Sequence, residues 1–490
     1  MPRQPPDVME KLTSLAKRRG FIFQSSEIYG GLASTWDYGH LGVELKRNIK
    51  NRWWRDMVTA RQDVVGMDAA ILMHPKVWEA SGHVEQFHDV LVDNKLTKKR
   101  YRLDHLLGGQ ADVVVQRLCE RLGIAVEATE SALEVRIPKI IAAVLEKGDV
   151  DLNGLGIFDP SDLKQKQDAD WTLPRQFDLM FKTHIGPTEE DTNLAYLRPE
   201  TAQGIFVNFL NVQGAARAKL PFGIAQMGKA FRNEITTGNF IFRTREFEQM
   251  EMEFFIRPDD SAKWLEYWSQ ARLEWYASLG VHRDKLRLRP HGPEELAHYS
   301  SACYDVEYEF PFGWAELEGI ADRGTYDLER HQQFSGKKLT WFDPQSNKHI
   351  LPTVVEASAG VDRTVLTVLA DAYHEEDVMG ETRVVLRLDP ALAPITVAVF
   401  PLVNKEGMPE IARNLVDDLQ GDFAAFYDAG GSIGRRYRRQ DEAGTPFGVT
   451  IDGQTIEDQT VTIRERDTMK QDRIALDKVH SYLQEQLIVK

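Results

Sequence analysis

The prediction of the fold starts from residues 231–255, which read F-R-N-E-I-T-T-G-N-F-I-F-R-T-R-E-F-E-Q-M-E-M-E-F-F. Two strand-like runs, Ile224–Glu234 and Phe240–Ile256, flank the turn residues 236–239, which predicts an antiparallel hairpin. Because side chains alternate along a strand, the second run should present two different faces. One face carries Phe247, Gln249 and Glu251, and the other carries Glu248, Met250 and Met252.

The charges of this hairpin have two explanations. A solvated, ion-paired ribbon would account for the charges alone, but the many phenylalanines in the stretch argue against a freely exposed ribbon. Arginines lie near the turn, at Arg232, Arg243 and Arg245, beside the carboxylates of the second strand. Guanidinium and carboxylate groups are costly to bury without ligands. A polyanion bound together with a cationic group would satisfy both kinds of charge.

Length and composition limit the possible partners. A chain of 490 residues is too long for one ordinary core, so two to four domains are expected. The formal net charge of −15 means that nucleic acid could bind only through local basic patches, and this is the strongest bulk argument against a nucleic-acid partner. The two cysteines, Cys119 and Cys303, lie far apart, which argues against a disulfide framework or a zinc site. Neither a signal core nor a membrane-length apolar run is present, so the cytoplasm is the expected location.

Three further motifs complete a pattern. F-R-N-E followed by F-R-T-R-E-F resembles motif 2 of the class II aminoacyl-tRNA synthetases, in particular their glycyl branch. R-P-E-T-A-Q-G-I-F at 198–206 closely matches the same branch. E-A-S-A-G-V-D-R at 356–363 resembles motif 3, usually G-x-G-x-x-R; Ser358 replaces its first glycine, a departure that agrees with the glycyl branch. The apolar stripe predicted for a helix over Leu41–Met57, before a strand over 63–75, is similar to motif 1, although an ordinary buried helix explains that stripe equally well.

The expected fold is α+β and has four parts. Residues 1–91 would form the N-terminal part of an antiparallel-sheet catalytic domain with motif 1, 92–175 an insertion, and 176–390 the rest of the catalytic domain with motifs 2 and 3. Residues 391–490 read as a C-terminal α/β domain with a mixed sheet that ends in a helix over 473–487. The run G-R-R-Y-R-R-Q-D-E-A-G in it is similar to the anticodon-binding domain of class IIa synthetases. Around Tyr437 it offers a cationic, stacking-capable patch for tRNA, made of Arg435, Arg436, Arg438 and Arg439.

The resemblance implies amino-acid activation with ATP. In this reaction the catalytic groups would be Arg232, on the α-phosphate and the substrate carboxylate, and Arg363, on the far end of the triphosphate. Mg²⁺ is expected to bridge the phosphates, with Glu316 as a candidate ligand. Glu316 and Glu318 are both expected on one face of their strand. The ATP site implied by the resemblance consists of Arg232, Asn233, Glu234, Phe242, Arg243, Thr244, Arg245, Glu246, Phe247, Glu316, Leu317, Gly360, Val361, Asp362 and Arg363.

A glycine site must hold an ammonium group and exclude larger side chains. Carboxylates can do the first, and steric exclusion does the second without an editing domain. Glu200, Glu251 and Glu356 are the expected ammonium ligands, supported by Ser358 and Arg323. The full substrate set is Arg100, Glu200, Phe247, Glu248, Gln249, Met250, Glu251, Arg323, Glu356, Ala357, Ser358, Ala359 and Gly360.

The resemblance thus implies a homodimeric enzyme that joins glycine to tRNA(Gly) at the expense of ATP, with neither DNA nor a membrane as partner. Two rivals remain. An adenylating paralogue that charges another carrier would be expected to lack the C-terminal tRNA domain, which this chain keeps. A nucleic-acid-binding relative without enzymatic activity has no need for both Arg232 and Arg363.

Overall fold

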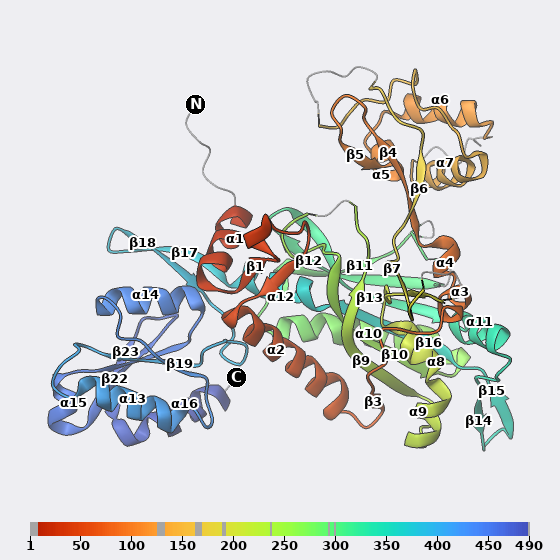
Figure 1. The fold of residues 1–490 in the computed structure, drawn as a ribbon. Coiled ribbons are helices and arrows are strands. Elements are labelled where there is room, and N and C mark those ends of the chain that lie inside the picture. The colour runs from red at the N-terminus through yellow and green to blue at the C-terminus, as the bar shows by residue number, and fades with distance from the viewer. Residues whose placement is uncertain are drawn as a thin grey trace.

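The computed structural model describes residues 8–124, 133–161, 169–188, 193–235, 238–292, 295–297 and 300–488. Residues 236 and 237 of the expected turn lie outside this set. A seven-stranded sheet forms the centre of the molecule (Figure 1), in the order β11-β12-β13-β16-β10-β9-β3. All neighbours are antiparallel except β3, which runs parallel to β9. The strands are β3 (Val64–Gly66), β9 (Phe222–Phe231), β10 (Glu246–Ile256), β11 (Leu286–Pro290), β12 (Ala302–Phe310), β13 (Gly313–Gly324) and β16 (Thr353–Gly360).

The predicted hairpin is confirmed as β9 and β10, with Glu251 opposite Gln226. Its strands are shorter at the turn than predicted, because residues 232–234 and 240–245 belong to the connection between them. Its two faces differ as the alternation predicts. Met250 and Met252 are buried in the main core, whereas Phe247 and Gln249 line a cavity on the other face. The main core lies between the sheet and three helices, α2 (His40–Trp54), α10 (Ser261–Ser278) and α12 (Val361–Ala372). The cavity therefore opens on the face of the sheet that these helices leave uncovered.

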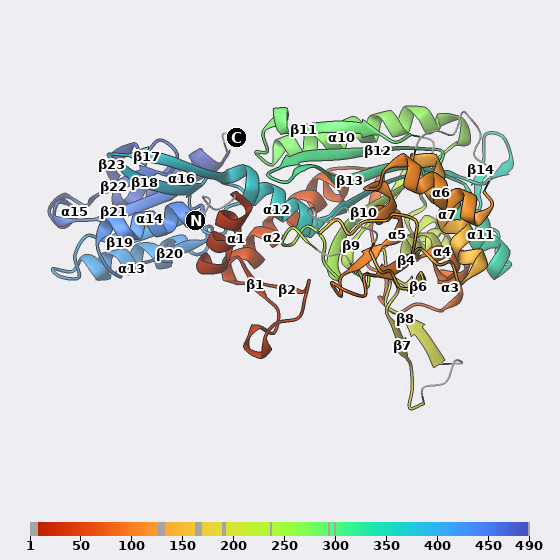
Figure 2. The same ribbon diagram turned by 90° about the horizontal axis from the view of Figure 1, so that it is seen from above.

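A second core covers the far end of that other face. Phe206 and Phe209 pack there against Phe222 and Phe255 of the hairpin strands. The helices of this region are α8 (Ala202–Val207), α9 (Phe209–Ala216) and α11 (Tyr326–Ser335). Smaller elements around the catalytic sheet are α1 (Val8–Arg19), β1 (Ile22–Gln24), β2 (Trp36–Tyr38), α3 (Lys76–Ala80), α4 (His83–Gln86), β7 (Lys182–His184), β8 (Leu194–Tyr196), β14 (Trp341–Asp343), β15 (Lys348–Ile350), β17 (Tyr373–Val378) and β18 (Glu381–Leu386). The β1–β2 and β7–β8 hairpins project from one side of the molecule (Figure 2).

The insertion is a separate layer with its own core, which stands off the catalytic sheet (Figure 1, orange). It is built from β4 (His88–Asp93), β5 (Arg100–Arg102), α5 (Leu103–Gly108), α6 (Asp112–Leu122), α7 (Leu133–Lys147) and β6 (Arg175–Asp178). Because β4 pairs with both β5 and β6, strand pairing extends this unit at both ends beyond the predicted 92–175.

The C-terminal domain (blue in Figure 1) has the predicted mixed sheet, in the order β20-β19-β21-β22-β23. β19 pairs in parallel with both β20 and β21, whereas β22 is antiparallel to both of its neighbours, β21 and β23. The prediction of a helix from Arg473 was wrong, because this segment pairs with β22 and the helix starts only at Val479. The elements are β19 (Val397–Pro401), α13 (Met408–Leu419), β20 (Ala425–Tyr427), α14 (Ile433–Ala443), β21 (Phe447–Ile451), α15 (Gly453–Asp458), β22 (Thr460–Glu465), β23 (Gln471–Ala475) and α16 (Val479–Ile488).

Two further expectations about strands were wrong. The strand expected over 63–75 comprises only Val64–Gly66, and Pro75 is the N-cap residue of α3. Beyond β3 the side chains of Gln226 and Arg198 bond the backbone of Ala69 in place of a strand partner. Glu316 and Glu318 do not share a face. A β-bulge inserts Leu317 between them, so that Glu316 stands opposite Glu307 and Glu318 opposite Val306. Across the described ranges no helix has both the length and the apolar character that a bilayer crossing requires.

Candidate active site

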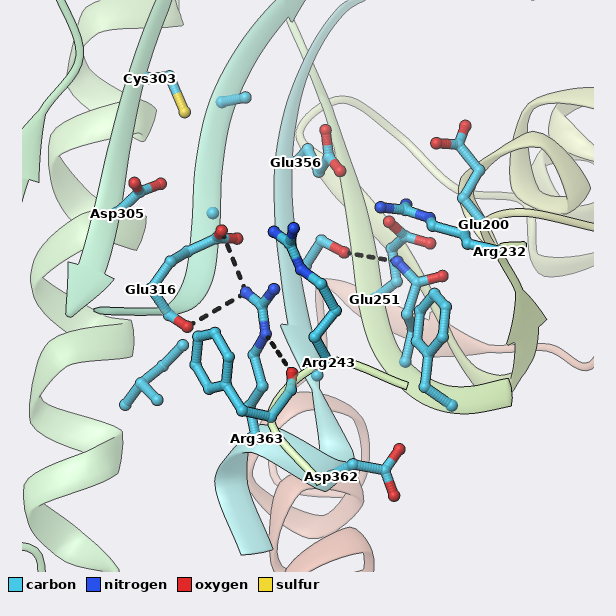
Figure 3. Close-up of a pocket in the computed structure, with 18 of the residues that line it drawn as sticks. Glu200, Arg232, Arg243, Glu251, Cys303, Asp305, Glu316, Glu356, Asp362 and Arg363 are labelled. Atoms are coloured by element: carbon cyan, nitrogen blue, oxygen red, sulfur yellow. Dashed lines mark hydrogen bonds and ion pairs between the residues drawn. The ribbon is translucent and has the colours of Figure 1, made fainter. Parts of the chain in front are cut away.

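The cavity on the open face of the sheet has a volume of about 370 Å³. Its walls come from the β9–β10 hairpin, from β13 and β16, and from the start of α12 (Figure 3). The sequence predicts that Arg232, Arg363 and Glu200 meet in one cleft, and all three line this cavity although 131 positions separate Arg232 from Arg363. Figure 3 shows Arg232 beside Glu200 at one end and Arg363 beside Glu316 at the other. Each end of the cavity thus holds an arginine beside a glutamate.

Arg232 is held from three sides. Its Nε donates to the carbonyl oxygen of Pro199 at 2.9 Å. Its guanidinium carbon lies 5.4 Å from the ring centroid of Phe247 and 5.4 Å from that of Phe87. Contacts of a guanidinium with two aromatic faces fix its plane while leaving its N–H groups directed along that plane. These donors can therefore meet an anion with little further ordering.

Arg363 lies in the first turn of α12, where a cation opposes the helix dipole. Its guanidinium donates to the backbone oxygen of Glu316 at 3.1 Å and approaches the Glu316 carboxylate at the same distance. It also covers the ring of Phe242, 4.6 Å from the centroid. Arg243 lies between Arg232 and Arg363 in Figure 3. The placement of Arg363 is explained by anionic groups in the cavity rather than by helix stability.

The β-bulge at Leu317 determines the surroundings of Glu316. It directs the Glu316 side chain into the cavity and sends Glu318 to the helical side, where Arg272 of α10 donates to it at 2.6 Å. Arg363 lowers the pKa of Glu316 against the opposing effect of burial. Glu316 is therefore an ionised carboxylate on the cavity wall.

The acidic end of the cavity contains Glu200, Glu251 and Glu356, the three predicted ammonium ligands. Burial would raise the pKa of Glu200, but His83 and Arg323 outweigh it and hold that pKa well below its usual range. Burial and the charges of Glu356 and Glu200 raise the pKa of Glu251 to about 8. At neutral pH Glu200 is thus ionised, whereas Glu251 still holds its proton.

A buried network fixes this acidic end from behind. Arg323 donates to Glu356 at 2.8 Å and to both oxygens of Asp327 at 2.8 and 3.0 Å. Gln203 donates to Glu200 at 3.0 Å and to Asp327 at 2.9 Å, so one network reaches two of the three carboxylates. Arg323 does not line the cavity itself. It acts on the site through Glu356.

Several residues of the predicted sets do not line the cavity. Strand alternation places one group on the helical side of the sheet: Glu248, Met250, Ala357 and Ala359. Val361 begins α12 and is buried in the same core. A second group lies where the strands meet the connecting loop of the hairpin, and its members form hydrogen bonds or ion pairs within the protein: Asn233, Arg245 and Glu246. Arg100 lies on β5 of the insertion, where it forms an ion pair with Asp93 at 2.6 Å.

The sequence reasoning missed part of the cavity wall, formed by His291 and β12. His291 Nε2 lies 2.8 Å from Asp305, and Arg289 donates to the same oxygen at 3.0 Å. Cys303 completes a group whose possible ligand atoms lie within 4.8 Å of one another, although burial raises the pKa of its thiol to about 12. The order of the strands, in which β12 pairs with β13, brings Asp305 to the cavity, and no local pattern contains this order.

The arginine patch on α14 differs from its prediction. Arg436 is 3 % exposed and donates to the backbone oxygens of Gly431 and Pro401, so it supports the domain rather than a surface. Tyr437 is packed against Phe400, and Arg464 covers its ring, which leaves no open face for stacking. Arg439 forms an ion pair with Asp428 at 2.6 Å. Arg435, by contrast, is exposed, and Arg438 is half-buried.

Comparison with known proteins agrees with this architecture. Residues 181–372 match the family model of the tRNA synthetase class II core domain (G, H, P, S and T), and residues 396–486 match that of the anticodon binding domain. A glycine–tRNA ligase from Caldanaerobacter subterraneus subsp. tengcongensis is 51 % identical over 481 residues, which cover 98 % of each chain. This chain belongs to the glycine–tRNA ligase family. A second member, from Thermobifida fusca, is 49 % identical over 489 residues, again with 98 % of each chain covered.

A solved structure shares the fold of the family at much lower identity. Prolyl-tRNA synthetase from Cryptosporidium parvum, complexed with halofuginone and AMPPNP, aligns with a TM-score of 0.61 at 12 % identity, over 98 % of this chain and 77 % of that one. Both the class II core and the C-terminal domain predicted from the sequence are thereby confirmed. Family membership also removes the objection raised by the net charge, since the relatives of this chain act on tRNA.

Proposed function

We propose that this chain is a glycine–tRNA ligase, which activates glycine with ATP and transfers the glycyl group to the 3′ end of tRNA(Gly). The observation that carries the proposal is the meeting of Arg232, Arg363 and three glutamates in one cavity. Family membership supports the same activity. The adenylating paralogue is disfavoured because the C-terminal tRNA domain is present, and the non-enzymatic rival because both arginines line the cavity.

In the first step a carboxylate oxygen of glycine attacks the α-phosphorus of ATP, the bond to the β-phosphate oxygen breaks, and pyrophosphate leaves. No protein nucleophile is required, so catalysis consists of positioning and charge neutralisation. Arg232, held between two aromatic rings, is suited to the α-phosphate and the substrate carboxylate. Arg363 would bind the terminal phosphates, releasing Glu316 from its ion pair.

Mg²⁺ fits the same end of the cavity. Its preferred protein ligands are one or two carboxylates, with the phosphates of the substrate completing the shell. Glu316 is ionised, faces the cavity and becomes available when Arg363 turns to an anion. When bound, the ion would neutralise the pyrophosphate as it leaves.

Glycine recognition rests on the acidic end. Glu200, Glu251 and Glu356 would surround the ammonium group, while Arg232 holds the carboxylate at the other side of the α-carbon. Ser358 contributes a hydroxyl that already accepts a hydrogen bond from Gln249 at 3.2 Å. A larger amino acid would have to displace these buried, hydrogen-bonded groups, and exclusion of this kind discriminates strongly.

In the second step a hydroxyl at the 3′ end of tRNA(Gly) attacks the carbonyl carbon of the adenylate and AMP leaves. The exposed Arg435 and the half-buried Arg438 are the patch residues suited to tRNA. We also propose a homodimer formed through α2, on the resemblance of residues 41–75 to motif 1, and a cytoplasmic location, where translation consumes the product. Analytical ultracentrifugation tests the dimer directly.

The decisive experiment is ATP–pyrophosphate exchange screened against all standard amino acids, with and without tRNA, followed by charging of tRNA. Exchange with glycine alone, together with glycyl-tRNA formation, is the expected result. Exchange with glycine but no charging of any tRNA would favour the adenylating rival. No exchange with any amino acid would refute the proposed activity.

A further inference from the structure

The segment that leads into the insertion lies directly behind the active-site cavity. It comprises α3, α4 and Phe87, the residue before β4. Neither His83 nor Phe87 lines the cavity, yet each contacts one of the groups that do. No motif quoted from the sequence includes either residue.

His83 contacts the carboxylate of Glu200. Its Nε2 lies 3.4 Å from Glu200 Oε2, and both side chains are about nine-tenths buried, 12 % and 11 % exposed. Gln203 binds the other oxygen of the same carboxylate, so the two contacts fix the plane of the Glu200 carboxylate from opposite sides.

A short hydrogen-bond chain holds the imidazole in turn. His83 Nδ1 lies 2.8 Å from the hydroxyl of Ser81, and this hydroxyl donates to the backbone oxygen of Trp78 at 3.3 Å. The ring is also clamped by the side chains of Trp78 and Phe87, with centroid distances of 5.5 and 5.4 Å. The Ser81 hydroxyl and the two aromatic rings thus hold the imidazole with its Nε2 toward the Glu200 carboxylate.

Phe87 supports the catalytic arginine in the same way. Its ring lies 5.4 Å from the guanidinium carbon of Arg232, which is equally far from Phe247. The backbone fixes this ring, because Leu179 N–H donates to the Phe87 oxygen at 3.2 Å and Asn233 N–H donates to the Leu179 oxygen at 2.8 Å. The two ends of the insertion are thus bonded to each other and to the residue after Arg232.

We propose that His83 and Phe87 are positioning residues for amino-acid activation: His83 orients Glu200 toward the substrate ammonium, and Phe87 holds the plane of Arg232. This inference rests on the proposed function. The two residues act on different groups, so they should affect different kinetic constants. Loss of the His83 contact weakens glycine binding, whereas loss of the Phe87 ring slows the chemical step, because Arg232 neutralises charge that develops in the transition state.

The test for His83 compares two amides in glycine-dependent ATP–pyrophosphate exchange. His83→Gln places an amide N–H near the position of Nε2, while the shorter His83→Asn cannot reach Glu200. His83→Asn should raise the KM for glycine about 10-fold, with kcat and the KM for ATP within about twofold of the original protein. His83→Gln should recover most of this loss. If His83→Asn does not fold, Ser81→Ala provides a second test. It keeps the imidazole but removes its hydrogen-bond partner at Nδ1, and it should also raise the KM for glycine.

The test for Phe87 compares Phe87→Leu, which keeps apolar volume without a π face, with Phe87→Tyr, which keeps the ring. Phe87→Leu should lower kcat about 3- to 10-fold. Phe87→Tyr should retain the original kcat. Melting temperatures of all variants show whether a change reflects unfolding.

The outcomes separate the inference from the proposed function. If the original protein performs no glycine-dependent exchange, the proposed function fails. If it does, and His83→Asn leaves the glycine KM unchanged or His83→Gln is no better than His83→Asn, the role of His83 is refuted. Equal kcat values for Phe87→Leu and Phe87→Tyr would likewise refute the role of Phe87.

Discussion

Glycine binding should depend steeply on pH, because one of its expected ligands holds a proton at neutral pH. Burial and the neighbouring carboxylates raise the pKa of Glu251 to about 8 from an ordinary value of 4.5. At pH 7 roughly one-tenth of the free enzyme then carries an ionised Glu251. The ammonium of glycine prefers that ionised form, so the apparent affinity is reduced by the same fraction. The KM for glycine should therefore fall about 10-fold from pH 6 to pH 7 and level off above pH 8.

The perturbation that tests this reasoning is Glu251→Gln, which keeps the shape of the side chain and an acceptor for Thr201 but cannot titrate. The variant should bind glycine more weakly at high pH and lose the slope between pH 6 and 8. The assay is glycine-dependent exchange across this range, with calorimetry in buffers of different ionisation enthalpy to count the protons released. A slope that persists in Glu251→Gln would refute the assignment of this pH dependence to Glu251.

The same shift makes a prediction for the stability of the glycine-free protein. Because the folded-state pKa of Glu251 lies above its ordinary value, the folded protein holds this proton more tightly than the unfolded chain does. The stabilisation is complete below pH about 4.5 and is lost as the pH rises toward 8. The melting temperature should fall across this window, and it should fall less in Glu251→Gln.

Four more variants test the roles of other arginines. Arg232→Ala should reduce glycine-dependent exchange at least ~10²-fold with little change in melting temperature, and undiminished exchange would refute its role. Arg323→Met should destabilise the catalytic domain by about 3–5 kcal/mol in urea unfolding, because it leaves Glu356 and its network uncompensated; a change under about 1 kcal/mol would contradict this. Replacing Arg435 and Arg438 by alanine should impair tRNA charging and spare exchange, whereas Arg436→Ala should destabilise the C-terminal domain by about 1–3 kcal/mol. Equal loss of exchange and charging in the Arg435 and Arg438 variant would mean that these residues are structural.

Local patterns predicted the parts of the site that lie on single regular elements. The alternation along β10 assigned Phe247, Gln249 and Glu251 to one face, and the cavity lies on that face. The resemblance to motif 3 implied that Arg363 meets an anion, and Arg363 lies in the first turn of α12, where it faces the carboxylate of Glu316. Along β10 the period of the backbone fixes the direction of the side chain, so a sequence read alone is sufficient.

Other features depend on pairing that no local pattern contains. The bulge at Leu317 reverses the direction of Glu318. A prediction that counts alternate residues along a strand cannot include the extra residue of a bulge. Arg436 was predicted to belong to a cationic surface. Its position on α14 instead points it at the carbonyl group of Gly431, just before the helix, and at that of Pro401, at the end of β19. His83 was missed for a different reason. It contacts Glu200 across 117 positions of sequence, within a segment too short to show any period.

The hydrogen bond between Leu179 and Phe87 brings the two ends of the insertion to within 3.2 Å of each other. Because its two ends are adjacent, the insertion leaves the catalytic domain and returns to it at the same place. The stretch from β4 to β6 could be replaced by a tight turn without rerouting any strand of the catalytic sheet. Its contribution to tRNA charging can therefore be obtained by subtraction, as the difference between the whole protein and a shortened one that keeps Phe87 and Leu179.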